Sequence, residues 1–416
     1  NETTTANITA KTLTLSGLTA SNKTYDGNTV ATISSYGTLA GVIGSDSVSL
    51  NSSSADPDFD TKNVGTSKTV TVLSLALSGD DAGNYTIGDE TTTADITAKL
   101  LTSTLTASNK VYDGDASVTS SLALTGLVGS ETLSTSYSAS FADKNVGTGK
   151  TVTATSITLA DGDNGGLASN YSISSSQTTT ANITAKSLTI SGITASNKTY
   201  NANTTATIDV TSASYSGLVS GDSVVVAATG VFDNKNVGTG KTVTLTSSYS
   251  GDDYTNYSIT DQSTTTADIT AKTLTASAST SNKTYDGDTT ATTTLTLSGV
   301  VSGDTVTSSN SSTFDTNNVG TGKTVTVNSI TLAGTDAANY SISSGQTTTA
   351  NITAKTLTLS GLTANNKEYD GTTVATISSY GTLSGVIGSD SVSLNSTRAD
   401  PDFATASVGS SKTVTV

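Results

Sequence analysis

The chain of 416 residues lacks cysteine, methionine, tryptophan and histidine altogether. Without cysteine there is no disulfide framework, zinc finger or thiol chemistry, and without histidine the common catalytic triads are excluded. The absence of methionine and tryptophan removes side chains that oxidise readily, which suits a long life outside the cell. No run of 18 or more apolar residues occurs, so we predict no membrane-spanning segment.

Positive charge is also scarce, because 19 lysines and arginines face 34 aspartates and glutamates, for a net charge of −15. Nucleic acids and anionic membranes both attract basic surfaces, so we expect neither nucleic-acid binding nor direct membrane insertion. Charged residues make up only 13% of the chain, while Val, Ile and Thr alternate in short runs. This composition predicts a folded all-β protein rather than a disordered one.

One nine-residue string, Thr-Thr-Thr-Ala-(Asn/Asp)-Ile-Thr-Ala-Lys, occurs five times, and its closing lysines are 83 to 88 residues apart. This period is too long for a solenoid coil and fits a small domain with its own core. We therefore divide the chain into the final strand of a preceding repeat (1–10), repeat 1 (11–98), repeat 2 (99–185), repeat 3 (186–271), repeat 4 (272–354) and a truncated repeat 5 (355–416).

Repeat 5 is a near-copy of repeat 1, since residues 11–72 and 355–416 differ at only ten positions. Neighbouring repeats resemble each other much less. The pattern indicates a second period of four domains, and we expect the chain to be a segment of a longer protein. Unlike neighbours have a physical benefit, because similar adjacent domains are prone to misassembly.

Each repeat reads as about seven short strands with turns every 8–12 residues. In repeat 1, Leu13 and Leu15 alternate with threonines, as in a half-buried strand, and Asp26-Gly27 signals a tight turn. These features are typical of immunoglobulin-like antiparallel β-sandwiches. We predict a tandem array of such domains, each of about 86 residues.

Two aromatic positions recur in the repeats. The five phenylalanines of the chain occupy one position, that of Phe59, and we predict that they anchor the cores. Tyr85 and its counterparts follow an asparagine near the end of each domain, where an immunoglobulin-like tyrosine ties its hydroxyl to upstream backbone. A change of alternation phase between Val72 and Leu73 predicts a bulge or a switch of the buried face.

The junctions between repeats contain no Gly-, Pro- or Ser-rich linker, as residues 94–102 show. A last strand that runs directly into a first strand leaves little slack for hinge motion. We therefore predict a stiff, extended rod in which each domain is on the order of 35–45 Å long.

The motif Asn-Lys-x-Tyr-Asp-Gly recurs at 22–27, 109–114, 282–287 and 366–371, and Lys-Asn-Val-Gly recurs at 62–65, 144–147 and 235–238. In these motifs the chain resembles the YDG-type tandem repeats of very large bacterial surface proteins, often of the filamentous-haemagglutinin type. The resemblance implies an extracellular location on a bacterial cell surface, with attachment or fibre formation, and it supplies no catalytic residue. In repeat 3 the motif reads Tyr-Asn-Ala at 200–202, which favours a structural turn over a reactive site.

Calcium is the sharpest site hypothesis that the residues raise. The candidate ligands are carboxylates of repeat 1, namely Asp56, Asp58, Asp60, Asp80 and Asp81. Calcium takes six to eight oxygen ligands, and loops between domains can supply them. The other complete repeats read 138–141, 229–232 and 311–314 in place of 56–59 and lack the acids there, so plain solvated loops are favoured, and we expect no other metal and no cofactor.

The residues also raise the hypotheses of an isopeptide bond, a sugar-binding surface and a pair of catalytic carboxylates. A Lys–Asn or Lys–Asp isopeptide bond would suit a rod under tension, although glutamates occur only at inconsistent positions. The recurring tyrosines could stack on sugars, but buried tyrosines with bonded hydroxyls are the more usual outcome. No pair of carboxylates recurs as a single tuned site, so we expect a protein that is not an enzyme.

The sequence therefore favours a structural function. We expect a stalk or fibre segment of a giant extracellular adhesin, which gives reach and multivalent attachment to a cell surface or matrix. Its expected partners are other copies of itself in a fibre or bundle, and a host-cell, matrix or glycan target. The alternative is an array of glycan- or self-binding modules.

Overall fold

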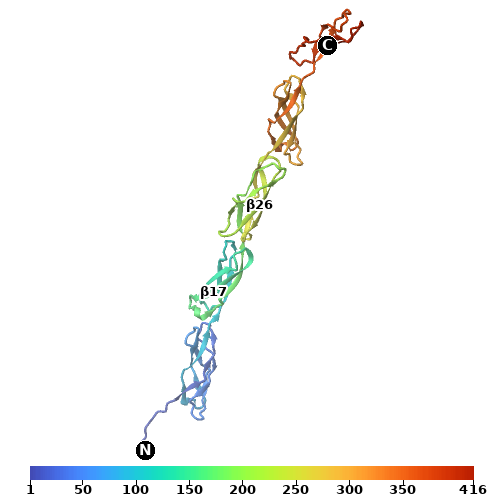
Figure 1. Cartoon of the computed structure of the whole chain (residues 1–416). Coiled ribbons are helices and arrows are strands. Elements are labelled where there is room, and N and C mark those ends of the chain that lie inside the picture. Colours follow the sequence, from blue (N-terminus) through green and yellow to red (C-terminus); the bar gives the residue numbers. More distant parts are fainter. The chain divides into compact units, whose positions relative to one another are not determined.

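The computed structural model describes all residues, 1–416, and its regular structure is almost entirely β-strand, which confirms the all-β prediction. Figure 1 shows the repeats as β-rich bodies, with β17 in repeat 2 and β26 in repeat 3. No helix is long and apolar enough to cross a membrane. The helical elements are single 3-10 turns: η1 (Ala82–Asn84), η2 (Ala168–Asn170), η3 (Tyr254–Asn256) and η4 (Ala337–Asn339).

Repeat 1 illustrates the strand pattern of the repeats in this chain. Its strands are β1 (Lys11–Ser16), β2 (Thr19–Ala20), β3 (Lys23–Thr24), β4 (Ile33–Ser35), β5 (Thr38–Ala40), β6 (Ser49–Asn51), β7 (Asp56–Phe59), β8 (Gly65–Leu73), β9 (Ala76–Ser78), β10 (Tyr85–Ile87) and β11 (Glu90–Thr97). They form one sheet of order β10-β1-β5 and another of order β3-β11-β8-β7. Two short pairs, β2-β4 and β6-β9, complete the repeat.

The prediction of purely antiparallel sheets is wrong. The opening segment of repeat 1 contributes to both sheets: β1 pairs in parallel with β10, and β3 pairs in parallel with β11. Both pairs are parallel because the opening segment and the closing strands run in the same direction through the repeat. The same two parallel pairings recur in repeats 2, 3 and 4.

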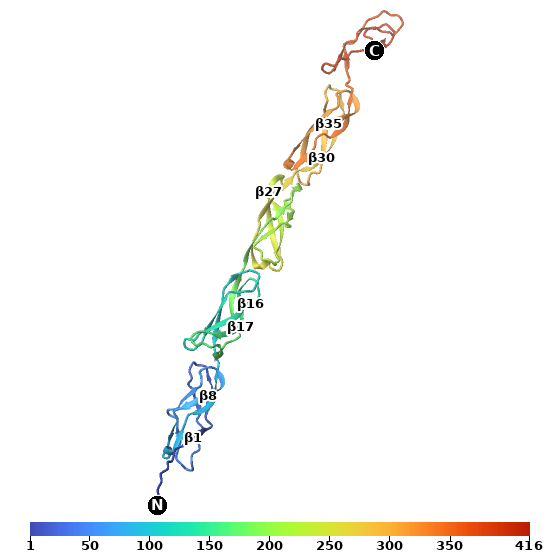
Figure 2. The same cartoon turned by 90° about the vertical axis from the view of Figure 1, so that its left-hand side faces the viewer.

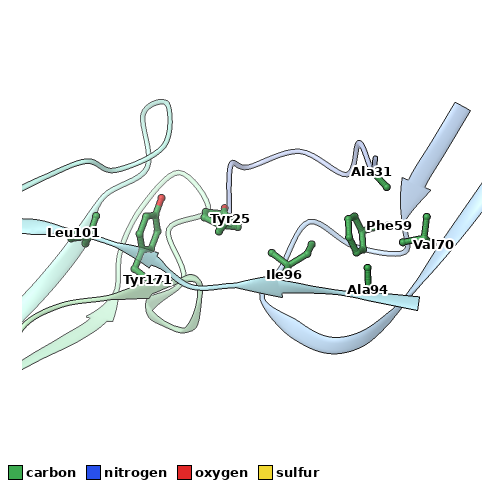
Figure 3. Close-up of a cluster of buried hydrophobic side chains, with 8 residues drawn as sticks. All are labelled: Tyr25, Ala31, Phe59, Val70, Ala94, Ile96, Leu101 and Tyr171. Atoms are coloured by element: carbon green, nitrogen blue, oxygen red, sulfur yellow. The ribbon is translucent and has the colours of Figure 1, made fainter. Parts of the chain in front are cut away.

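The core of repeat 1 lies between the strands that alternate most regularly. Leu13 of β1 and Val70 and Val72 of β8 are completely buried, and Ile96 of β11 is 1% exposed. Phe59, at the end of β7, is 3% exposed and packs in the same cluster as Val70 and Ile96 (Figure 3). The phenylalanine position is therefore a core anchor in repeats 1 to 4, as predicted.

The predicted change of face after Val72 is also confirmed. Ser74 has a positive φ of 60°, and there the chain leaves the sheet of β8 and β11. Beyond it, β9 pairs with β6 instead. In repeat 2 the equivalent Ser156 has a φ of 55° and lies inside one long strand, β17, as a bulge.

Repeats 2, 3 and 4 follow the same plan with fewer strands, and each contains one strand of 13 to 15 residues. Repeat 2 contains β12 (Lys99–Leu100), β13 (Thr102–Ala107), β14 (Lys110–Val111), β15 (Ser120–Thr125), β16 (Leu133–Phe141), β17 (Gly147–Asp161), β18 (Tyr171–Ser172) and β19 (Ser176–Thr184). Repeat 3 contains β20 (Lys186–Ser191), β21 (Thr194–Ala195), β22 (Lys198–Thr199), β23 (Thr205–Ala206), β24 (Ile208–Asp209), β25 (Ser214–Ser216), β26 (Val225–Phe232), β27 (Gly238–Ser250), β28 (Tyr257–Thr260) and β29 (Thr264–Thr270). Figure 2 shows β16 beside β17, its antiparallel partner.

Repeat 4 contains β30 (Lys272–Thr280), β31 (Lys283–Thr284), β32 (Thr290–Ala291), β33 (Thr293–Ser298), β34 (Thr307–Phe314), β35 (Gly320–Ala333), β36 (Tyr340–Ile342) and β37 (Thr347–Thr353). Repeat 5 contains β38 (Thr358–Ser360), β39 (Thr363–Ala364), β40 (Ile377–Ser379), β41 (Thr382–Ser384), β42 (Asp402–Phe403) and β43 (Val414–Thr415).

Residues 1–10, which have the sequence of a closing strand, form no strand. A strand is held by its neighbours, and here no neighbouring strand pairs with these residues. Residues 355–416 contain no counterpart of β11, and Phe403 is accordingly only half-buried. A hollow lined by Lys367, Phe403 and Val414 lies at the corresponding place in repeat 5.

The chain divides into two compact units. The first comprises Asn1–Ile190, Ser214–Val225 and Tyr249–Asp261, and the second comprises Ser191–Ala213, Val226–Ser248 and Gln262–Val416. The contacts of repeat 2 with repeats 1 and 3 lie inside the first unit. The contacts of repeat 4 with repeats 3 and 5 lie inside the second.

Candidate functional site

The most organised polar site in the chain is the contact between two consecutive repeats. In the first contact, Tyr25 of repeat 1 donates its hydroxyl proton to the Glu131 carboxylate of repeat 2, at 2.6 Å. Tyr171 of repeat 2 donates to the other oxygen of the same carboxylate, at 2.7 Å. Lys62 of repeat 1 adds a positive charge 3.4 Å from Glu131. One carboxylate thus collects three donors, two of which come from the neighbouring repeat.

The two tyrosine rings also contact each other. Tyr25 and Tyr171 meet edge to face, with ring centroids 5.3 Å apart and an angle of 78° between the planes. Both rings are nearly buried, at 1% and 5% exposure, and they pack with Leu101 of the second repeat (Figure 3). Edge-to-face aromatic pairs contribute about 0.5–1.5 kcal/mol beyond their buried area. The contact therefore combines apolar burial with charge-assisted hydrogen bonds.

The turn that follows Tyr25 holds its ring in place. The backbone N–H of Tyr25 donates to the carbonyl of Thr97 in β11, at 2.9 Å. Lys23 forms an ion pair with Asp26 at 2.9 Å and lies over the Phe59 ring, 5.7 Å from its centroid. The lysine of the motif therefore ties the Tyr-Asp-Gly turn to the core of its own repeat, and the tyrosine side chain extends into the next one.

Tyr171 is held by the arrangement predicted from immunoglobulin-like tyrosines. Its hydroxyl oxygen accepts the backbone N–H of Val128, at 3.0 Å, while its proton goes to Glu131. The same hydrogen bond to upstream backbone occurs in repeats 1, 3 and 4, from Ile43 to Tyr85, from Val219 to Tyr257 and from Val301 to Tyr340. The prediction for these tyrosines is confirmed, and their role includes orienting the carboxylate.

A second strip of hydrogen bonds lies beside the tyrosines. Asn170 of repeat 2 is completely buried, and its side-chain oxygen accepts the backbone N–H of Val64 in repeat 1, at 2.9 Å. Its amide group donates to the side chain of Asn63, at 3.0 Å. The corresponding Asn84 has no preceding repeat against it and is exposed. Contact between repeats is therefore what buries this asparagine.

The glycine of the Tyr-Asp-Gly motif is required both by its conformation and by close approach. Gly27 has a φ of +84°, and a Cβ there would lie 2.7 Å from Cγ1 of Val128 in the next repeat. Gly114 meets Val219 in the same way at 2.8 Å. Repeat 3 departs from this rule, because Ala202 holds the position with a φ of +64°. A non-glycine residue in this region is strained.

The second contact repeats the first with different acids. Tyr112 and Tyr257 donate to one oxygen of Asp222, at 2.8 and 2.5 Å, and their ring centroids are 5.5 Å apart. Lys144 forms ion pairs with Asp222 at 3.2 Å and with Asp253 at 2.8 Å. Two short aspartates thus replace the single, longer Glu131 of the first contact.

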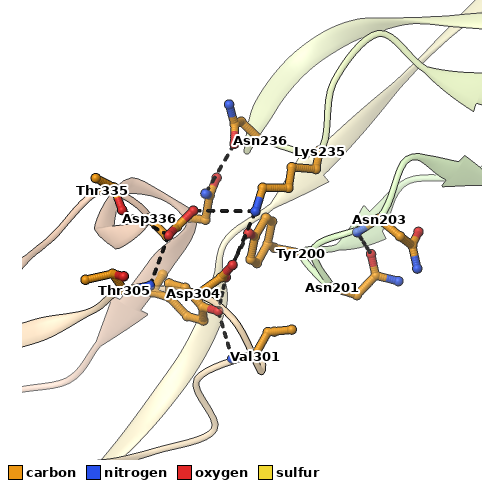
Figure 4. Close-up of polar contacts among 12 residues, drawn as sticks. Tyr200, Asn201, Asn203, Lys235, Asn236, Val301, Asp304, Thr305, Thr335 and Asp336 are labelled. Atoms are coloured by element: carbon orange, nitrogen blue, oxygen red, sulfur yellow. Dashed lines mark hydrogen bonds and ion pairs between the residues drawn. The ribbon is translucent and has the colours of Figure 1, made fainter.

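The third contact, between repeats 3 and 4, has the same form (Figure 4). Tyr200 and Tyr340 donate to Asp304 at 2.8 and 2.6 Å, and Lys235 lies 3.2 Å from Asp304 and 3.5 Å from Asp336. Tyr200 is 1% exposed although the Asp and Gly after it are replaced. The altered motif of repeat 3 therefore still makes its contact.

The charges of these sites are set by mutual hydrogen bonding. Burial tends to raise the pKa of Glu131, but donors from Tyr171, Tyr25 and Lys62 outweigh it and hold the pKa below its ordinary value. Burial and the neighbouring Asp222 raise the pKa of Tyr257 to about 12. At neutral pH Tyr257 is therefore a protonated donor and Glu131 a charged acceptor, and hydrogen bonds to a charged acceptor are short.

The fourth contact, between repeats 4 and 5, lacks the cation. Asn317 occupies the position of the lysines, and its amide donates to Gly287 of its own repeat, at 2.9 Å. Tyr285 hydrogen-bonds to Asp390, which raises the pKa of the phenol. A Cβ on Gly287 would lie 2.8 Å from Ile387, so the close approach of the two repeats is retained.

The structure does not gather the calcium candidates into one site. Asp56 and Asp58 lie on β7, Asp60 forms an ion pair with Lys68 at 2.7 Å, and Asp81 accepts the backbone N–H of Ser47. Asp80 is exposed. No group of three or more acidic side chains in the chain is placed to hold a metal ion.

The acid at the centre of each contact was not predicted from the sequence. It stands at one position in every repeat, three residues after an apolar pair: Asp46, Glu131, Asp222, Asp304 and Asp390. An alignment of the five repeats reveals this acidic position only if glutamate and aspartate are treated as equivalent, because repeat 2 has Glu131 where the others have aspartate. The Lys-Asn-Val motif was recognised without its role, because its partners lie more than 60 residues ahead.

Comparison with known proteins agrees with the repeat structure. The YDG domain matches the chain five times, over residues 9–94, 97–181, 184–267, 270–350 and 353–416. A search of functionally curated proteins finds no match. The matched segments cover nearly the whole sequence, and the chain therefore belongs to the YDG domain family, with five copies of the domain in tandem.

Proposed function

We propose that the chain is a stalk or fibre segment of a large extracellular bacterial adhesin. Its domains would be immunoglobulin-like sandwiches joined into an extended rod, which gives reach and multivalent attachment to a cell surface or matrix. This role needs no catalytic residue and no cofactor.

The observation that carries the proposal is the repeated contact between domains. Three times, a tyrosine and a lysine from one repeat meet a carboxylate and a tyrosine of the next. The donor face and the acceptor face of a repeat are different surfaces, so the contact is head-to-tail. Contacts of this kind extend as an open array unless the rotation between successive repeats closes a ring.

The covalent connection supports the same function. At the first three junctions a single residue separates the closing strand of one repeat from the opening strand of the next: Ala98, Ala185 and Ala271. Such a connection lacks the length of a flexible linker. A short connection together with a polar, aromatic contact resists bending at the junction.

The alternative, an array of binding modules, would call for exposed aromatic side chains in corresponding loops of several repeats. Tyr254 and Tyr369 are well exposed, but they occupy different positions in their repeats. The recurring tyrosines of repeats 1 to 3 are instead buried in the contacts between domains.

Electron microscopy of material from the producing cells tests the proposal. We expect a thin fibre with an axial repeat of about 40 Å, from strand lengths at ~3.3 Å per residue. A matched control is the purified chain with a Gly-Ser linker inserted after Ala98, which should show a bend at that junction in small-angle scattering and micrographs. Compact particles, or equal flexibility with and without the linker, would shift the weight to independent binding modules.

A further inference from the structure

Tyrosine is the most readily oxidised side chain in this sequence. The sequence holds 15 tyrosines and no cysteine, methionine, tryptophan or histidine, so no other readily oxidised side chain competes. Six of these tyrosines form the three pairs across the contacts between repeats. We propose that these pairs are sites of oxidative cross-linking, at which a one-electron oxidant joins consecutive repeats through a dityrosine bond.

The geometry of the three pairs supports this chemistry. Ring centroids are 5.3, 5.5 and 5.4 Å apart, with interplanar angles of 78°, 76° and 74°. In the second and third contacts both hydroxyls donate to the same carboxylate oxygen, so the two phenol oxygens are held close together. The ring carbons next to those oxygens, at which tyrosyl radicals couple, are therefore held near each other as well.

The carboxylate supplies the proton acceptor that the reaction needs. When a phenol loses an electron, its hydroxyl proton becomes strongly acidic and passes along the existing hydrogen bond to the acid, such as Glu131 or Asp304. A lysine beside the carboxylate keeps that acid ionised before the step. The carboxylate returns protons to solvent once the bond has formed.

The reaction is balanced as follows. Each of the two phenols gives up one electron and one proton to become a phenoxyl radical. The radicals form a carbon–carbon bond ortho to their oxygens, and the two ring hydrogens at those carbons move to the oxygens and restore the phenols. Two electrons and two protons leave in total, and hydrogen peroxide, used by a haem peroxidase, takes them up to give two water molecules.

Burial directs the reaction toward the partner ring. Tyr25, Tyr112 and Tyr200 are each 1% exposed, which keeps their radicals from coupling with another chain. Tyr254, which is 38% exposed, lies three residues before Tyr257 and offers a route for the oxidising equivalent into the second contact. A buried radical then meets one neighbouring phenol, that of the adjoining repeat.

The test uses the full chain at low concentration, treated with hydrogen peroxide and a haem peroxidase, then digested and analysed by mass spectrometry. We expect three linked peptide pairs, Tyr25–Tyr171, Tyr112–Tyr257 and Tyr200–Tyr340, each lighter by two hydrogens than its two peptides. Tyr285 is an internal control, because residues 353–416 contain no counterpart of Tyr340. Links confined to exposed tyrosines such as Tyr369, or links between chains, would overturn the proposal.

Two comparisons separate geometry from general reactivity. Tyr171→Phe keeps a ring in place and should abolish the first linked pair while the other two form, which also reports that the variant is folded. Tyr36→Phe, outside the contacts, should leave all three pairs. If the same three pairs dominate in chain unfolded by urea, the contacts are not their cause and the proposal fails. None of these outcomes depends on the fibre spacing that tests the stalk function.

Discussion

The hydroxyl of Tyr25 donates to the carboxylate of Glu131 at 2.6 Å, although 106 residues separate them in the chain. The tyrosine belongs to the turn motif of one repeat, yet its hydrogen bond completes the next repeat. Each domain is thus stabilised partly by its neighbour, which makes the contact the natural target for mutation.

Removing the Tyr25 hydroxyl should weaken the first contact. Tyr25→Phe keeps the ring against Tyr171 but leaves a buried oxygen of Glu131 without this donor, at an expected cost of about 1–3 kcal/mol. Denaturant unfolding of the full chain measures the loss. Tyr369→Phe is the matched control, because this tyrosine has the same place in repeat 5 and is 69% exposed. Equal effects of the two substitutions would contradict the assignment.

Replacing Ala202 with glycine should stabilise repeat 3. The alanine has a φ of +64°, where a Cβ is strained, so Ala202→Gly should gain about 1 kcal/mol. The reverse change, Gly27→Ala, should destabilise repeat 1 more strongly, since its Cβ would also approach Val128 to 2.7 Å. Thermal melting of each variant checks the two signs, and a lower melting temperature for Ala202→Gly would count against strain at this turn.

Removing the lysine from the third contact should destabilise that contact, and adding a lysine to the fourth contact should stabilise it. Lys235→Asn removes the cation that lies 3.2 Å from Asp304, and we expect the melting temperature of the repeats that form this contact to fall. Asn317→Lys adds a cation where Tyr285 meets Asp390, and we expect a rise. Both effects should shrink at high salt, because the lysines are partly exposed. A change in melting temperature that does not depend on salt concentration would indicate an effect of packing instead of charge.

Acid should loosen the first contact. Because the pKa of Glu131 is lowered in the folded chain, its stabilisation is complete above the ordinary glutamate pKa of about 4.3 and is lost as pH falls through the folded value. Glu131→Gln should lower stability at pH 7 and reduce the loss between pH 5 and 3. Other acids titrate in the same range, so the quantity to compare is the difference between wild type and variant. A difference that stays constant with pH would show that Glu131 is not the titrating group.

Calcium should leave the stability of the chain unchanged. The candidate acids form no group that could hold a metal ion, and two of them are engaged elsewhere, Asp60 in an ion pair with Lys68 and Asp81 in a hydrogen bond from Ser47. Melting of a chelator-treated sample before and after calcium addition measures this directly. A clear rise in melting temperature, abolished by Asp60→Asn, would restore the calcium hypothesis for repeat 1.

The sequence by itself determined the features that repeat locally. The period placed the repeats, alternation of apolar and polar residues predicted strands, and a single phenylalanine per repeat predicted the core anchors of repeats 1 to 4. The tyrosine hydrogen bond to upstream backbone could also be predicted, because Tyr85 and Ile43 belong to one repeat. These signals depend on residues that are close in sequence or confined to one fold unit.

Only the tertiary structure decided which residues meet across the repeats and how the opening strand is shared. Alternation cannot distinguish a parallel from an antiparallel partner, so the pairings of β1 with β10 and of β3 with β11 were missed. Likewise, the sequence offers many possible hydrogen-bond partners for a buried tyrosine and for an acid in a loop. The contact between Tyr25 and Glu131 depends on the folded surfaces of two repeats. The short connection at Ala98 keeps these two surfaces together.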